Sequence, residues 1–225
     1  MLTFDAATDN PAFNWEKNSN RYRNKETGRF ISKEAVYTLT QKRIEYVKGD
    51  LGSVGQLLLD GKINLKTWQQ QTAETLKILH TQQYLLGVGG QKALKKSDYL
   101  EIGRELKNQY QYLRKFAVDL TQGKMSPAQF NARLSMYGDA AKVSFFRGEK
   151  VAAGRAGFTH GRRSLTSGHI HCSDCPVYAA RGIVPIDEVV MPSVACQCRT
   201  NCKCRVTYFT LQEAIAFNEE VRTRT

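Results

Sequence analysis

The chain has 225 residues, of which 41% are hydrophobic and 24% charged, the composition of a folded globular protein rather than a disordered or fibrous one. Its length allows one medium domain or two small ones with an ordinary apolar core. No apolar run approaches the ~18 residues that a membrane helix needs, and residues 1–10 lack the pattern of a secretory signal. We therefore expect neither a membrane protein nor a secreted one. The net charge of +12 predicts an acidic partner, with nucleic acid as the first candidate.

Residues 1–31 are expected to form a basic N-terminal arm. Residues 1–20 are polar and aperiodic, with Trp15 as their large anchor, so we expect them to become ordered only against a partner. Residues 24–28, Asn-Lys-Glu-Thr-Gly, have the composition of a turn and predict a short hairpin or an extended turn.

Residues 32–157 are predicted to form a bundle of long helices, arranged as two helical hairpins. Apolar residues recur there at steps of three and four, and capping residues and glycines mark the helix ends. Four helices are expected to follow the caps Ser32, Asn64, Ser97 and Ser126, with apolar faces ending at Leu58, Leu86, Leu120 and Phe145. The protein is therefore predicted to be mainly α.

The two helical hairpins have the pattern of a duplication. Residues 61–68, Gly-Lys-Ile-Asn-Leu-Lys-Thr-Trp, align with residues 123–130, Gly-Lys-Met-Ser-Pro-Ala-Gln-Phe, 62 positions later. Each segment gives a glycine, a lysine, an apolar residue, a cap and an aromatic residue four positions after the cap. Because helix–Gly–cap–helix sequences recur widely, a chance similarity between two turns remains the alternative.

All six cysteines lie between Cys172 and Cys204, and the 171 residues before them contain none. Disulfide frameworks usually spread their cysteines over the fold, so this clustering predicts a local metal site in a reducing compartment. The alternative is a set of buried reduced cysteines, or disulfides formed on release from the cell.

The cysteine spacing is typical of a tetrahedral metal site. A Cys-x-x-Cys turn presents two thiolates to one ion, and a second cysteine group after twenty intervening residues can complete the shell. The expected ligands are Cys172, Cys175, Cys202 and Cys204. Cys196 and Cys198 are alternates, or with a histidine the start of a second site, and His169 and His171 are the nearest imidazoles. We expect the ion to be a structural Zn²⁺, since sulfur donors suit zinc and a segment with few large apolar residues needs its folding energy, on the order of 10 kcal/mol.

Two stretches around these cysteines resemble a known signature. Residues 169–182, His-Ile-His-Cys-Ser-Asp-Cys-Pro-Val-Tyr-Ala-Ala-Arg-Gly, and residues 201–205, Asn-Cys-Lys-Cys-Arg, are similar to the C-terminal signature of the phage head-morphogenesis family, the Mu F-like minor head proteins of tailed bacteriophages. The close match covers residues 169–208. The region before it resembles the family only in being helical. Residues 22–30 are also similar to a Tyr-Arg-x-x-x-Thr-Gly-Arg-Phe pattern common near the start of phage-encoded proteins.

The chain departs from that family pattern at two places. The proline-rich stretch before the last cysteines is reduced to residues 191–193, and the pair Cys196-x-Cys198 is extra. The first departure leaves the loop structure open, and the second leaves the identity of the ligands open. The resemblance implies a virion protein near the portal vertex, present in few copies, assembled in the host cytoplasm, with portal or capsid proteins as partners.

Basic residues form two groups that can contact packaged DNA or an acidic protein surface. The first group is Arg21, Arg23, Lys25 and Arg29, and the second is Arg155, Arg162, Arg163, Arg199, Lys203 and Arg205. Tyr22 and Phe30 interleave the first group, as in a platform on which single-stranded bases stack. Solvated surfaces explain both groups equally well. His80 has no visible catalytic partner and is expected to be a surface or packed histidine.

Residues 158–225 are expected to form a cysteine-rich zinc module that closes with a helix, because Thr210 and Glu213 have capping-box spacing. The sequence lacks support for a nucleophilic dyad or triad, so no enzyme is expected. The predicted function is that of a structural protein of a tailed-phage virion, of minor-head type, that docks at the portal or inner capsid and assists assembly or DNA packaging and ejection. The alternatives are a zinc-stabilised nucleic-acid-binding protein without a virion role, and a capsid-decorating or connector component.

Overall fold

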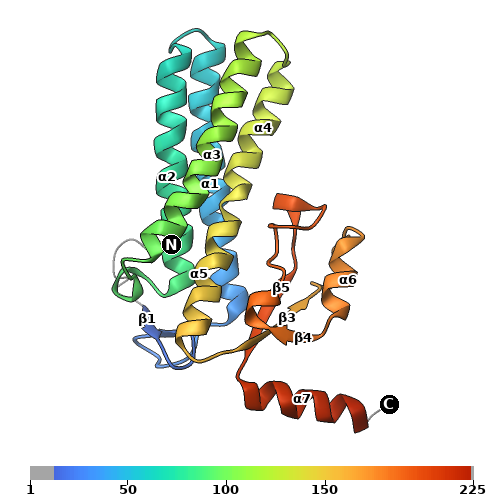
Figure 1. Cartoon of the computed structure of the whole chain (residues 1–225). Coiled ribbons are helices and arrows are strands. Elements are labelled where there is room, and N and C mark those ends of the chain that lie inside the picture. The colour runs from blue at the N-terminus through green and yellow to red at the C-terminus, as the bar shows by residue number, and fades with distance from the viewer. Residues whose placement is uncertain (1–12, 224–225) are drawn as a thin grey trace.

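Four long helices stand side by side as a stalk, and a small module with a three-stranded sheet lies beside its base (Figure 1). The computed structural model describes residues 13–223. The helices are α1 Lys33–Leu59, α2 Leu65–Val88, α3 Asp98–Thr121, α4 Pro127–Ala140, α5 Lys142–Arg155, α6 Asp174–Ala180 and α7 Leu211–Thr223. The strands are β1 Phe13–Glu16, β2 Arg21–Asn24, β3 His160–Ser164, β4 Ile183–Pro185 and β5 Arg205–Phe209. The expectation of a mainly α protein with two helical hairpins is confirmed.

Three of the four predicted caps bind the first turn of their helices. The side chain of Ser32 accepts the N–H of Ala35 at 3.1 Å, and that of Asn64 accepts the N–H of Thr67 at 2.9 Å. Ser126 makes a reciprocal capping box with the third residue of α4. Ser97 makes no such bond before α3.

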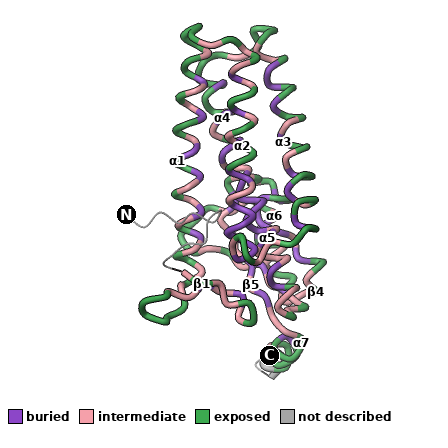
Figure 2. Tube along the Cα trace, turned by 90° about the vertical axis from the view of Figure 1, so that its left-hand side faces the viewer, coloured by how far each residue is buried: buried purple, intermediate pink, exposed green. Residues whose placement is uncertain are grey.

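The two hairpin turns lie at the same end of the stalk (Figure 1). Gly61 and Gly123 each follow the C-cap of the first helix of their hairpin and have a positive φ, +69° and +64°. The aligned aromatic residues Trp68 and Phe130 are both buried, and their ring centroids lie 5.7 Å apart in the core between the helices. The inward positions of the stalk helices are buried and the outward ones exposed (Figure 2). The repeated turn sequence therefore places equivalent residues in one shared core.

The fourth predicted helix is broken into two. Its apolar face was expected to continue to Phe145, but α4 ends at Ala140 and α5 begins at Lys142. The break is a single residue: Ala141 keeps helical torsions (φ −65°, ψ −17°), and its N–H bonds to the carbonyl oxygen of Gly138, three residues back, at 3.2 Å. Beyond the break, Gly87 of α2 and Gly148 of α5 each lie against the backbone of the opposite helix, where a side chain would collide.

The N-terminal segment from Phe13 to Asn20 has a partner within the chain. Strand β1 pairs with β2 in an antiparallel hairpin, and the ring of Trp15 covers Gly89 at the end of α2. The hydroxyl of Tyr22 donates to the carbonyl oxygen of Leu86 at 2.9 Å. The segment was expected to become ordered only against a partner, and residues 13–20 pack against β2 and the end of α2 of the same chain. Residues 1–12 of the arm lie outside the described residues.

The C-terminal module is built on the antiparallel sheet β4-β3-β5. Apolar side chains of this sheet share a core with α5, in which Val206 and Tyr208 lie with Phe145 and Phe146. The predicted capping box opens α7, because Thr210 and the third residue of that helix bond reciprocally. Within residues 13–223, none of the helices has the length and hydropathy to span a bilayer.

Candidate metal centre

All six cysteines come together in one cluster between α6 and the segment that leads into β5. The cysteines of the Cys-x-x-Cys turn lie at the start of α6, where the turn directs both sulfurs to the same side. The other four lie on the loop before β5, which folds back over α6. Four of the six are almost fully buried, with exposed fractions between 0% and 3%: Cys175, Cys196, Cys202 and Cys204.

The spacing between the sulfurs fits metal coordination and is longer than a disulfide bond, and all six cysteines are free. The Sγ atom of Cys175 lies 3.5 Å from that of Cys172, 3.4 Å from that of Cys198 and 3.9 Å from that of Cys202. The Sγ atoms of Cys196 and Cys198 are 3.5 Å apart. Four sulfurs held at ~2.3 Å from a tetrahedral zinc lie about 3.8 Å from one another, whereas a disulfide needs ~2.05 Å. The cluster can therefore hold a metal ion.

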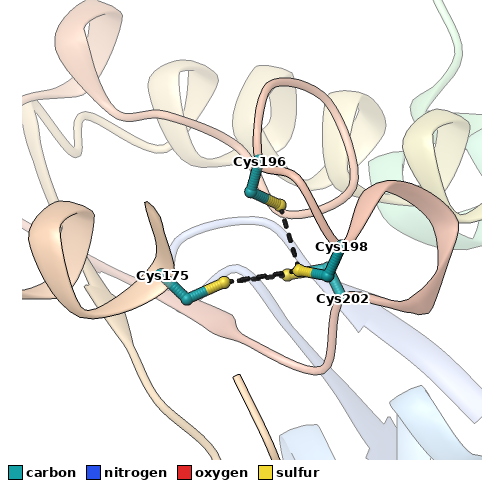
Figure 3. A group of neighbouring side chains, drawn as sticks. All are labelled: Cys175, Cys196, Cys198 and Cys202. Atoms are coloured by element: carbon teal, nitrogen blue, oxygen red, sulfur yellow. Dashed lines mark hydrogen bonds between the residues drawn. The ribbon is translucent and has the colours of Figure 1, made fainter. Parts of the chain in front are cut away.

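Among the described residues, the four cysteines whose sulfurs all lie close together differ from the expected ligand set. The thiols of Cys175, Cys196, Cys198 and Cys202 all lie within 4.8 Å of one another (Figure 3). Two of these belong to the expected four, and the other two were named as alternates. Cys172 lies beside the group, with its Sγ 3.4 Å from that of Cys198.

Cys204 belongs to a second group, which it forms with His171 and Cys175. The Nδ1 atom of His171 lies 3.8 Å from the Sγ of Cys204. Its Nε2 atom lies 2.9 Å from the carbonyl oxygen of Thr166. Of the two histidines considered from the sequence, only His171 is part of the cluster, since His169 is exposed and belongs to neither group.

A buried arginine lies against the sulfurs. Arg163 on β3 is only 3% exposed, and its Nη2 donates to the sulfurs of Cys175, Cys196 and Cys202 at 3.2, 3.3 and 3.0 Å. Its Nη1 donates to the carbonyl oxygen of Val190 at 3.2 Å. A buried cation requires a compensating negative charge, and here its partners are sulfur atoms rather than a carboxylate. Arg163 therefore favours thiolates, the form of cysteine that binds metal.

The thiols differ in how readily they lose a proton. Burial raises the pKa of Cys202, but backbone hydrogen bonds, that from Cys204 first, and the charge of Arg163 outweigh burial and lower the pKa to about 7. At Cys172 hydrogen bonds from Cys198 and its neighbours also outweigh burial and lower the pKa to about 6. Burial raises the pKa of Cys198 to about 12. The thiol of Cys198 therefore ionises at neutral pH only if a bound cation replaces its proton.

The location of Arg163 corrects one prediction. It was expected, with Arg162, to reach phosphates, but its burial among the cysteines leaves nothing for a partner to contact. Residues of β3 alternate between buried and half-buried, so Arg163 shares the inward face with Gly161. The residues of this strand, His-Gly-Arg-Arg-Ser, show no apolar alternation, so the sequence gives no signal that distinguishes Arg163 from Arg162. Arg162 faces the other way and lies over the ring of Phe217, 4.8 Å from its centroid.

The basic residues of the hairpin remain near the surface. Arg21 and Arg23 both lie over the ring of Phe30, at 4.4 and 4.2 Å from its centroid. Arg23 also forms an ion pair of 2.9 Å with Glu16. Two further basic residues of this group are exposed, Lys25 and Arg29. From the second group, Arg155 is instead an internal ion-pair partner, 2.6 Å from Asp98.

Comparison of the chain with protein-family models, curated proteins and solved structures finds no match in any of the three.

Proposed function

We propose that this chain is a non-enzymatic structural protein of a tailed-phage head, of minor-head type, in which a zinc–thiolate centre holds the C-terminal module together. The observation that carries the proposal is the buried cysteine cluster with a guanidinium bound to its sulfurs. It supports a closed structural site, because protein donors surround the ion and leave no open position for a substrate.

Zinc is the proposed ion on the chemistry of the donors. The cluster offers thiols and an imidazole, and a carboxylate belongs to neither group of donors. Such donors select a borderline-soft ion over magnesium or calcium, which prefer oxygen. The module also lacks an apolar core of its own at this point, since the buried residues around α6 are mainly the cysteines themselves. A structural ion supplies the missing folding free energy there.

The virion role rests on the resemblance of residues 169–208 to the minor head proteins. These are the residues that build the cluster, so the resembling segment is also the segment with the most specific chemistry in the chain. The helical stalk offers long exposed faces for docking to the portal or inner capsid (Figure 2). In this proposal the protein is present in few copies and assists assembly or DNA packaging and ejection.

Quantitative mass spectrometry of purified particles tests the virion role, by counting this chain against the portal protein. A ratio near one or below, together with portal association, is expected. Hundreds of copies per particle would instead make the protein a capsid-decorating component. Absence from mature particles would contradict a virion role and leave a transient assembly factor or a nucleic-acid-binding protein.

One observation favours nucleic-acid binding as a second candidate function. Phe30 is 36% exposed and carries the guanidinium groups of Arg21 and Arg23 against its ring, next to exposed Lys25 and Arg29. Direct binding through this surface predicts an affinity for DNA that falls steeply with salt, because each neutralised phosphate releases counterions. Substitution Arg29→Gln should then reduce the slope of log K against log salt by about one. An affinity independent of salt and of Arg29 excludes this role for the hairpin.

A further inference from the structure

We infer that the cluster holds two metal ions, which share the thiolate of Cys175. This inference rests on the metal site proposed above. One ion lies among Cys175, Cys196, Cys198 and Cys202, and the second lies among His171, Cys175 and Cys204 and draws in Cys172 as its fourth ligand. The second ion would connect the loop that ends at Cys204 to the start of α6.

The number of donors is the first argument. The cluster contains six thiols and one imidazole, seven donors in all. A single tetrahedral ion uses four and would leave three soft donors packed together without a ligand. Two separate tetrahedral ions need about eight donors, and two ions that share one thiolate need one donor fewer. The set present equals the requirement of a pair with one bridging cysteine.

The geometry identifies which cysteine is shared. Cys175 is the residue that belongs to both groups of donors whose atoms lie within 4.8 Å of one another. It is also fully buried, and its Sγ lies within 3.9 Å of three other Sγ atoms. Cys172 follows His171 directly in the chain and its Sγ lies 3.5 Å from that of Cys175. Its Sγ also lies 3.4 Å from that of Cys198, and Cys172 is not within 4.8 Å of both His171 and Cys204, so it moves away from the first group to become the fourth ligand of the second ion.

The orientation of His171 is an independent argument for the second ion. A carbonyl oxygen only accepts hydrogen bonds, so the contact between Nε2 and the oxygen of Thr166 places the proton on Nε2. The lone pair is then on Nδ1, the atom that faces the sulfur of Cys204. Metal-binding histidines characteristically donate their other N–H to a carbonyl or carboxylate in this way. His171 therefore has the tautomer and direction of a ligand.

The test is the number of ions bound by the full chain. Reduced, metal-free protein is titrated with Zn²⁺ to saturation, and bound zinc per chain is counted by native mass spectrometry. We expect two ions for the wild type, one for His171→Asn and Cys204→Ser, and two for the control His169→Asn, which changes an exposed imidazole two residues away. In protein loaded with ¹¹³Cd, two resonances coupled through the shared sulfur are expected.

The outcomes separate this inference from the metal site on which it rests. One ion per wild-type chain at saturation, unchanged in His171→Asn, overturns the second ion and leaves the first. No bound ion at saturation overturns both. Two uncoupled cadmium resonances would overturn the sharing of Cys175. Because the decisive count is made on the wild type, a variant that fails to fold does not affect the test.

Discussion

Gly148 of α5 faces Gly87 of α2 with no side chain between the two helix backbones. A Cβ atom on Gly148 would meet the carbonyl oxygen of Tyr84, and one on Gly87 would meet the carbonyl oxygen of Phe145. This contact positions α5 at the base of the stalk, and the sheet of the C-terminal module packs against α5. The glycine pair therefore determines where the cysteine cluster lies relative to the bundle.

The substitution Gly148→Ala is expected to lower the free energy of unfolding by about 1–3 kcal/mol or more, because the added methyl group forces two packed backbones apart. Gly154→Ala is the matched control, since this glycine lies on the exposed side of the same helix with open space around its Cα. It should stabilise the protein by roughly 0.5–1 kcal/mol. Urea unfolding measures both, and equal effects of the two substitutions would contradict the role of the contact.

Arg163→Met should weaken zinc binding, because it removes the hydrogen bonds and the positive charge that compensate the buried thiolates. Groups that support metal ligands in this way typically change affinity by about 10–100-fold. Competition with a coloured zinc chelator measures the affinity. Arg181→Gln is the control, because it removes a guanidinium from the exposed surface of the same module, where Arg181 pairs with Glu188 at 3.6 Å. An unchanged affinity in Arg163→Met would show that the guanidinium only fills space.

His80 makes the stability of the stalk depend on pH. It is fully buried between α2 and α5, with Nδ1 2.8 Å from the hydroxyl of Ser144, and burial lowers its pKa from 6.5 to about 3. Between these two values the unfolded chain binds a proton that the folded chain does not. The free energy of unfolding therefore falls as the pH drops below about 6.5, by about 1.4 kcal/mol per pH unit.

His80→Gln should abolish this contribution, so the stability advantage of the wild type over the variant should shrink by about 2 kcal/mol between pH 7 and pH 5. Urea unfolding at each pH, followed through the buried Trp68, measures the difference, and contributions from the metal site cancel in it. The exposed His169 provides the matched control substitution, His169→Gln. A constant difference for His80→Gln would refute the assignment.

Removal of metal under reducing conditions should loosen the two cysteine segments, residues 165–182 and 192–204, and leave the stalk folded. These segments are held mainly by the sulfurs, whereas β4 stays paired with β3 and β5 retains its apolar contacts with α5 through Val206 and Tyr208. Hydrogen exchange before and after complete chelation should therefore show lost protection in the cysteine loops and little change in α1–α4. Unchanged protection throughout would contradict a structural metal.

The sequence alone determined the elements whose signals are local. Ser32 and Asn64 as caps, the glycine turns at Gly61 and Gly123, and the capping box before α7 all depend on residues within four positions of each other. The apolar period of the stalk helices likewise needs no knowledge of the neighbours. The clustering of all six cysteines between Cys172 and Cys204 is also visible without the fold, and it was enough to predict a metal site.

The tertiary structure decided what depends on contacts between distant segments. The close approach of α2 and α5 depends on two glycines, Gly87 and Gly148, that lie far apart in the chain, so the helical period of neither segment predicts it. The grouping of the cysteines depends on how the loop before β5 folds over α6, so spacing along the chain could not select the nearest four. From the sequence, Arg163 was expected to be a surface charge. In the fold, β3 directs its side chain inward, and the guanidinium compensates the charge of the cysteine cluster. Burial and coordination are properties of three-dimensional neighbours, and only the folded chain brings those neighbours together.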